Sequence, residues 1–139
     1  MLEYTEMNMS HYNESCDIWK NTPGLGLTAG DSEAAIKRYL EQNKGMSLVC
    51  TDTENKIIAG TILCGHDGRR GIIYHLAVRE DYRGQRIGIT LLNKGLDKIK
   101  QANVERVMAF VKDDNDSGSE FWIKHGFNRR ELIPYSKDL

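Results

Sequence analysis

The sequence predicts an α/β fold in which helices cover both faces of one mixed sheet. Residues 72–78 are apolar, β-branched or aromatic almost throughout, which is typical of a strand covered on both faces. Stretches with apolar residues at helical spacing stand before and after this strand. A chain of 139 residues can bury one core, so residues 1–139 are predicted to form a single domain with the order β-α-α-β-β-β-α-β-α-β(β).

The first elements follow from spacing and turn residues. Residues 2–7 alternate as in a strand, and residues 10–20 carry apolar side chains on one helical stripe. Residues 21–30 contain proline and three glycines, which predicts a loop, although an unusually apolar one. A second helix is predicted to begin after a cap at Asp31 or Ser32 and to end at a glycine.

The middle of the chain predicts a hairpin, the buried strand and a long helix. Residues 47–51 and 57–64 read as two strands joined by a polar turn. After the strand at 72–78, a helix is predicted over residues 87–102, with its apolar side chains on one stripe.

The last third predicts three more elements. Residues 104–111 are expected to form a strand, and a short helix then carries Phe121 and Trp122. Gly126 is expected to end that helix, and residues 127–136 to supply one or two final strands.

The composition excludes several functional classes. A net charge of −1 gives no overall attraction to nucleic acid or to an anionic membrane. The three cysteines are widely spaced and form no CxxC pair, so neither a disulfide framework nor a zinc site is predicted, and no metal is expected. The start of the sequence lacks the pattern of a signal peptide, and no apolar run is long enough to span a membrane, so a cytoplasmic protein is expected.

A short basic turn between the strand at 72–78 and the following helix is the strongest functional signal. It contains Arg79, Arg83 and Arg86 together with Gly84 and Gly88. The start of a helix offers unpaired N–H groups and a positive dipole end, and glycine lets a ligand approach the backbone closely. Such a turn suits a pyrophosphate.

These residues resemble the GNAT superfamily of N-acetyltransferases. That family carries Gln/Arg-x-x-Gly-x-Gly/Ala at this place, and residues 83–88 fit it except that Arg86 stands where the first glycine is usual. Asn115, the pair Phe121-Trp122 and the pair Gly126-Phe127 resemble its second signature. With the matching order of elements, the resemblance extends over nearly the whole chain.

The resemblance implies direct transfer of an acetyl group from acetyl-CoA to a small amine or to an amine of a peptide or protein. It implies that the Leu76 N–H polarises the thioester carbonyl and that the Val78 backbone binds the pantetheine. At Arg86, a right-handed helix opening that tolerates a side chain is expected, and the sequence leaves open whether the guanidinium reaches a phosphate oxygen or the 3′-phosphate of the coenzyme. The residues expected to bind the coenzyme are Leu76, Ala77, Val78, Arg83, Gly84, Gln85, Arg86, Ile87, Gly88, Ile89, Thr90, Asn115 and Trp122.

Two side chains that such enzymes often use are missing from this sequence. Trp122 occupies the place of the usual tyrosine acid and Ile72 that of the usual glutamate base. The remaining catalytic candidates are Tyr74, His75 and Tyr135, although the sequence favours for His75 a packed histidine that donates one N–H to the backbone. Because neighbours on a strand point to opposite faces, only one of Tyr74 and His75 is expected to face the acetyl group.

A thiol has a pKa of about 8.5, so the thiolate can leave without an acid. Cys64 is a possible acyl-enzyme nucleophile, but no base stands near it in the sequence, so Cys64, like Cys16 and Cys50, is expected to be a buried inert thiol.

Three further points stay open at this stage. Leu25 and Leu27 either line an acceptor pocket or pack into the core, and the turn at residues 66–70 is either solvated or part of the acceptor entrance. The C-terminal strands are a possible homodimer contact. An acyl-CoA-binding regulatory module without turnover is the alternative to an enzyme, because the usual acid and base are both absent.

Overall fold

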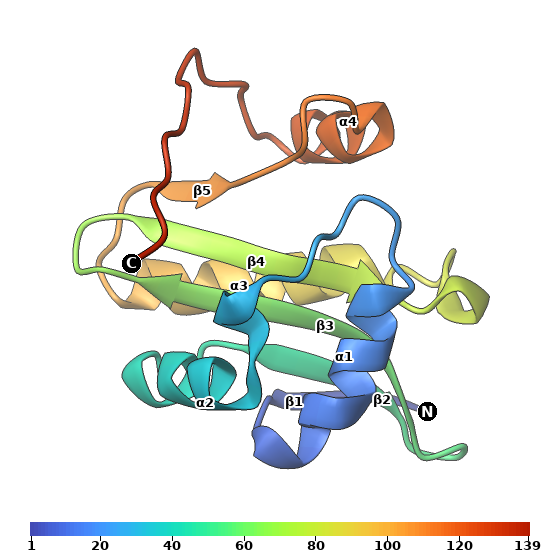
Figure 1. The fold of residues 1–139 in the computed structure, drawn as a ribbon. Coiled ribbons are helices and arrows are strands. Elements are labelled where there is room, and N and C mark those ends of the chain that lie inside the picture. Colours follow the sequence, from blue (N-terminus) through green and yellow to red (C-terminus); the bar gives the residue numbers. More distant parts are fainter.

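The computed structural model describes residues 1–139 and contains one sheet of five strands in the order β1-β2-β3-β4-β5 (Figure 1). The strands are β1 (Leu2–Glu6), β2 (Leu48–Asp52), β3 (Ile57–His66), β4 (Gly71–Val78) and β5 (Val107–Ala109). The strands β1 to β4 pair antiparallel, whereas β5 lies parallel to β4. The sheet is therefore mixed, as the sequence predicts.

Helices lie on both faces of this sheet, which confirms the predicted fold class. The helices α1 (Tyr12–Lys20) and α2 (Glu33–Gln42) cover one face, and α3 (Ile87–Gln101) covers the other (Figure 1). The helix α4 (Asp116–Lys124) follows β5 at the edge of the sheet. Short 3₁₀ turns are η1 (Met9–His11), η2 (Ala29–Asp31) and η3 (Glu80–Tyr82). None of the helices combines the length and the apolar character needed to cross a membrane.

Two apolar clusters attach the helices to the sheet. Leu91 of α3 and Ile73 of β4 belong to the cluster on the α3 face. Trp19 of α1 and Ala77 of β4 belong to the cluster on the face of α1 and α2. The strand β4 therefore contributes side chains to both clusters and lies between them.

The C-terminal segment differs from the prediction. The strand β5 has three residues rather than the eight expected, and no strand forms between residues 127 and 139. Leu132, Ile133 and Tyr135 are 65%, 77% and 91% exposed, so this segment has no buried apolar face that would hold it to the sheet. The final strands that were expected to form a homodimer contact are therefore absent from this structure. A homodimer stays a prediction.

Candidate active site

The strands β4 and β5 separate after a short contact, which leaves one side of β4 open. They pair only at Gly71–Val107, Ile72–Met108 and Ile73–Ala109. Beyond Ile73, the backbone of residues 74–78 has no strand neighbour on the β5 side. An extended ligand with amide groups can therefore bind to this part of β4 as an additional strand would.

A β-bulge lies at the start of this open stretch. Thr61 of β3 pairs with Ala77, but Leu63 pairs with Tyr74, so His75 and Leu76 together oppose a single residue. The backbone of His75 takes a positive φ of 48°. Such an extra residue shifts the alternation of all side chains that follow it.

The bulge places Tyr74 and His75 on the same face of the sheet. The His75 ring lies 4.6 Å from the ring of Trp19 in α1, and the Tyr74 ring lies 6.1 Å from that of Tyr39 in α2. Leu76 packs against the cluster on the opposite, α3 face. The prediction that only one of Tyr74 and His75 faces the reaction site is therefore wrong, because it assumed a regular strand.

A buried chain of hydrogen bonds holds the bulge in place. The Trp19 indole N–H donates to the Thr61 hydroxyl over 2.9 Å, and this hydroxyl donates to the His75 carbonyl over 2.9 Å. Trp19 and Thr61 are fully buried. The extra residue in β4 is thus stabilised by a side chain that lies far away in the sequence.

The His75 imidazole pairs with the carboxylate of Asp31, at the end of η2. The distance from Nε2 of His75 to Oδ1 of Asp31 is 2.5 Å, and each side chain is only 12% exposed. His75 is packed, as one of the two interpretations expected, but its ring bonds to the side chain of Asp31 and not to the backbone. Sequence reasoning considered Asp31 only as a helix cap, but Ser32 has that role, since its hydroxyl accepts the N–H of Ala35.

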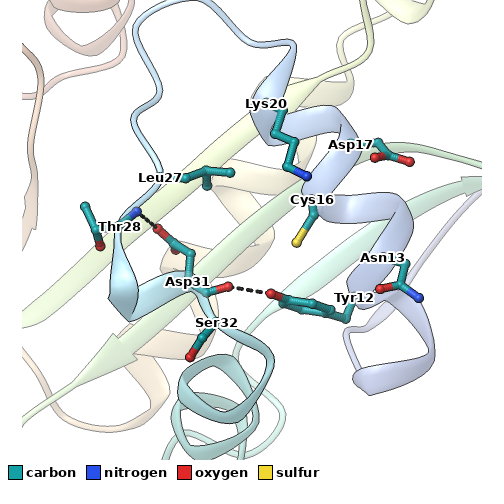
Figure 2. Close-up of a pocket in the computed structure, with 9 residues that line it drawn as sticks. All are labelled: Tyr12, Asn13, Cys16, Asp17, Lys20, Leu27, Thr28, Asp31 and Ser32. Atoms are coloured by element: carbon teal, nitrogen blue, oxygen red, sulfur yellow. Dashed lines mark hydrogen bonds between the residues drawn. The ribbon is translucent and has the colours of Figure 1, made fainter.

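Besides its contact with His75, Asp31 is held in place at two further atoms. Its second carboxylate oxygen, Oδ2, accepts the backbone N–H of Thr28 over 2.9 Å, and its carbonyl accepts the Tyr12 hydroxyl over 2.6 Å (Figure 2). These contacts fix the carboxylate relative to α1 and to the loop before η2.

The loop that opens α3 presents a row of free main-chain donors. None of the backbone N–H groups from Gly84 to Ile89 donates a hydrogen bond within the protein, and α3 has no side-chain cap. We call residues 83–89 the glycine loop. Unpartnered N–H groups next to the positive end of a helix dipole are an arrangement that favours an anion.

The conformation of Arg86 differs from the expectation. Arg86 has a φ of 62° and Gly84 a φ of 83°, so both lie in the left-handed region, whereas a right-handed opening was predicted for Arg86. For a non-glycine residue this costs about 1–2 kcal/mol. Two left-handed residues make the loop depart from a simple helix start, and successive N–H groups in such backbone often form a concave site for anions.

Thr90, another residue expected to bind the coenzyme, uses its donors inside the protein. Both its N–H and its hydroxyl donate to the Arg86 carbonyl, over 3.1 and 2.7 Å. Thr90 therefore stabilises the glycine loop.

The arginines that cluster in the sequence separate in space. Arg79 binds the carboxylate of Glu14, 3.2 Å away, and is used structurally. Residues 69 and 70 lie in the turn between β3 and β4, at the opposite end of β4, where the Asp67 carboxylate accepts both of their N–H groups. Only Arg83 and Arg86 remain at the glycine loop, and Arg83 donates to the Val78 carbonyl over 3.3 Å.

Asn115 and Trp122 have partners within the protein. The Asn115 side chain caps α4 by accepting the Gly118 N–H, and its amide lies so close to Gly24 that a methyl group there would come within 2.6 Å of it. The loop between α1 and η2 thus contacts the start of α4. The Trp122 ring packs 4.8 Å from that of Phe127.

A cavity of about 500 Å³ opens between α1 and the segment that leads into α2 (Figure 2). Leu27 lines it and is 36% exposed, whereas Leu25 packs against the cluster of α1 and α2. The sequence left open whether these leucines line a pocket or pack into the core, and in the structure Leu27 does the first and Leu25 the second. The cavity is lined by Tyr12, Asn13, Cys16, Asp17, Lys20, Leu27, Thr28, Asp31 and Ser32.

The cysteines also divide into two kinds. Cys50 and Cys64 are fully buried, and burial raises the pKa of Cys64 to about 12, so the prediction of inert thiols is confirmed for these two. Cys16 is only partly buried and lines the cavity. Its thiol forms a hydrogen bond with Tyr12. This bond is the main cause, and burial the second cause, of a pKa of Tyr12 raised to about 12. No cluster of three or more His, Cys, Asp or Glu side chains is placed to hold a metal ion.

One aromatic residue near the open edge of β4 escaped the sequence reasoning. Phe110 follows β5 directly, is 59% exposed and stacks on Tyr74 with ring centroids 6.5 Å apart. Tyr135, in contrast, lies in the exposed C-terminal segment and packs against neither Tyr74 nor His75. The structure brings together two of the three predicted side chains, and adds Asp31 and Phe110.

Comparison with known proteins gives a consistent result. A family model described as "Acetyltransferase (GNAT) family" matches residues 12–127. The fold is similar to that of the PaiA N-acetyltransferase from Thermoplasma acidophilum in complex with coenzyme A, with 15% identity over 96% of this chain and 93% of that chain and a TM-score of 0.80.

Two further solved structures are similar as well. A NatC complex bound to Gag peptide and CoA gives a TM-score of 0.74 at 22% identity over 94% of this chain and 86% of that chain. Glucosamine-6-phosphate N-acetyltransferase from Arabidopsis thaliana gives a TM-score of 0.71 at 17% identity over 99% of this chain and 98% of that chain.

Proposed function

This chain belongs to the acetyltransferase (GNAT) family, and on that premise we propose that it moves an acetyl group from acetyl-CoA to a primary amine by direct attack in a ternary complex. Family membership makes the protein an acyltransferase and acetyl-CoA its co-substrate. The observation that best supports the proposal is the row of free N–H groups from Gly84 to Ile89.

The glycine loop would bind the diphosphate of the coenzyme. Six unpartnered amides and the positive end of α3 favour a doubly charged anion, and Arg83 and Arg86 add two guanidinium groups. The pantetheine arm has amide groups that would bond to the open backbone of residues 74–78.

The bulge would supply the polarising donor. In the reaction, the amine nitrogen bonds to the thioester carbon, the carbon–sulfur bond breaks, and the thiolate takes a proton from the amine nitrogen. The Leu76 N–H stands at the bulge, where it would stabilise the negative oxygen of the tetrahedral intermediate. One such donor accounts for about 10²–10³ in rate. Trp122 and Ile72 offer no acid or base, and a thiolate leaves readily without one.

The acceptor would approach from the face of α1 and α2. Tyr74 and His75 lie there, next to the loop at residues 21–28. The names of the similar structures include a sugar phosphate amine in one case and a peptide in another, so the shared fold accommodates both kinds of acceptor. We propose a primary amine without choosing between these two classes.

Thiol release from acetyl-CoA tests the proposal. Purified protein would be given a polyamine, amino acid and peptide panel, and the expected result is release that depends on an acceptor. Tight binding of coenzyme with no release for any acceptor would contradict the enzyme and favour a regulatory acyl-CoA-binding module.

A further inference from the structure

We propose that Asp31 and His75 form one proton-accepting unit, in which Asp31 positions the imidazole and Nδ1 of His75 takes a proton from the acceptor ammonium. This inference rests on the proposed amine acetylation and adds a residue, Asp31, from the loop that borders the acceptor face.

The geometry of the pair is specific. The two residues are 44 positions apart in the chain, yet Nε2 of His75 and Oδ1 of Asp31 lie 2.5 Å apart. The Trp19 ring rests against the imidazole at 4.6 Å. The Thr28 N–H holds the second carboxylate oxygen, so the carboxylate itself is oriented by main chain.

The contact decides which imidazole nitrogen can act as a base. A carboxylate accepts hydrogen bonds, so Nε2 carries the hydrogen and the lone pair lies on Nδ1. No group of the protein bonds to Nδ1, and the buried side-chain atoms that lack a partner are only Ser15 Oγ and Tyr39 OH. Nδ1 is therefore both unpartnered and accessible.

The same bulge carries the proposed polarising donor, the Leu76 N–H. His75 immediately precedes Leu76, and the Thr61 hydroxyl fixes the His75 carbonyl. The proton balance is complete without another reactant. The ammonium gives one proton to Nδ1, the free amine forms the new carbon–nitrogen bond, and the departing thiolate takes a second proton from that nitrogen. His75 then returns its proton to water.

Several other titratable groups surround the imidazole. Asp31 is the charged partner on η2, while Tyr74 on β4, Tyr39 on α2 and the pair Tyr12–Cys16 on α1 are the other titratable neighbours. Burial raises the pKa of Tyr39 above its usual range, and that of Tyr12 is raised to about 12, so both phenols stay neutral near pH 7. Neither phenol therefore competes with His75 as a base near pH 7.

Variants in the acceptor-dependent kinetics test the unit. We expect His75→Gln to lower kcat/KM for the acceptor about 100-fold at pH 7. Asp31→Asn is expected to lower kcat about tenfold with little change in the KM of the acceptor, because the imidazole loses the carboxylate that orients it. Acetyl-CoA affinity should stay within twofold in both variants, which also shows that they are folded.

Glu33→Gln is the matched control, since Glu33 is an exposed carboxylate two residues from Asp31 that does not contact His75. Its rate and pH profile should equal those of the wild type. An Asp31→Asn variant with the wild-type kcat would overturn the proposal, as would a His75→Gln variant with the wild-type kcat/KM for the acceptor.

Nitrogen-15 NMR of the histidine side chains tests the same pair without turnover. The wild type is expected to hold His75 with hydrogen on Nε2 and to bind its second proton at Nδ1 as the pH falls. Hydrogen on Nδ1 at high pH would overturn the proposal even in an active enzyme. If no acceptor is turned over while the Nε2–H form is observed, the proposed function fails and the pair is shown to be structural.

Discussion

The glycine loop and the Asp31–His75 pair meet at the same strand, β4, but are built in opposite ways. The glycine loop offers main-chain N–H groups from one continuous stretch of sequence. The Asp31–His75 pair consists of two side chains from distant parts of the chain, which a bulge and a loop bring together. The first site therefore depends on local backbone conformation, and the second depends on tertiary packing.

This difference has a consequence for mutation. A substitution in the glycine loop should change coenzyme affinity and leave the acceptor chemistry intact. A substitution in the contacts that hold the bulge should change stability and turnover, and should weaken coenzyme binding less than a substitution in the glycine loop, because the diphosphate contacts remain. The variants below test this separation.

The largest effect is expected from Thr61→Val, which removes the buried hydroxyl under the bulge. The Trp19 N–H and the His75 carbonyl would both lose their partner, at a cost of about 2–4 kcal/mol in the free energy of unfolding. Urea denaturation measures this change, and kcat should fall with it. Thr51→Val is the control, because the Thr51 side chain in β2 makes no hydrogen bond. Equal stability of the two variants would show that the bulge does not depend on Thr61.

Gly84→Val addresses the other site. A β-branched residue with a φ near 83° is strained by about 1–3 kcal/mol, so the glycine loop should turn some N–H groups away and the Kd for CoA should rise about tenfold or more. Calorimetry measures the Kd.

Gly68→Val is the matched control for that variant. Gly68 has a φ of 91° and equally open surroundings, but lies in the turn at the far end of β4. Its substitution should lower stability without weakening CoA binding. A similar Kd for the two variants would separate the glycine loop from coenzyme binding.

Arg86→Gly should give a smaller effect. Removing a left-handed arginine relieves strain and should raise the free energy of unfolding by about 1 kcal/mol. The affinity for CoA should change less than tenfold, since a guanidinium is lost while the amides remain. Lys56→Gly, at a φ of 56° in the turn between β2 and β3, should give the same gain and no change in affinity. An affinity gain above tenfold for Arg86→Gly would show that Arg86 obstructs the site.

The smallest effect concerns the attachment of the segment before the glycine loop. The Tyr82 hydroxyl donates to the Asp52 carboxylate over 2.6 Å, and this bond, with those from Asn55, lowers the pKa of Asp52 to about 2. A carboxyl whose pKa is lower in the folded state than its ordinary value of about 3.9 stabilises the fold above that pH. The stabilisation is lost as the pH falls from about 4 to 2.

Thermal unfolding between pH 2 and 6 measures this contribution. In Asp52→Asn, the melting temperature should fall less steeply as the pH is lowered from about 4 to 2. Asp97 is an exposed carboxylate on α3 without an ion pair, so Asp97→Asn should keep the wild-type dependence. If the melting temperature of Asp52→Asn depended on pH as in the wild type, Asp52 would not be the source of this stabilisation.

The sequence predicts what depends on local spacing. The helices and the strands from β1 to β4 follow from apolar periodicity and turn residues, and the glycine loop follows from glycines and arginines between a strand and a helix. Arg86 is the exception, because its left-handed conformation follows from the whole loop and not from its own residue type.

The remaining features depend on contacts between distant residues. The alternation rule fails at His75 because Thr61 and Trp19 stabilise an extra residue there. Asp31 reaches His75 through the path of the loop before α2, which no local pattern encodes. The sequence predicts final strands over residues 127–136, but Tyr135 and its apolar neighbours are exposed and cover no core surface.

The most direct test of the account is the amide spectrum of the nitrogen-15-labelled protein during titration with CoA. The account predicts that the six amides from Gly84 to Ile89 and those of Leu76 and Val78 shift most, while the amides around Gly68 stay in place. Binding that leaves residues 84–89 unshifted, or no binding at millimolar CoA, would contradict it.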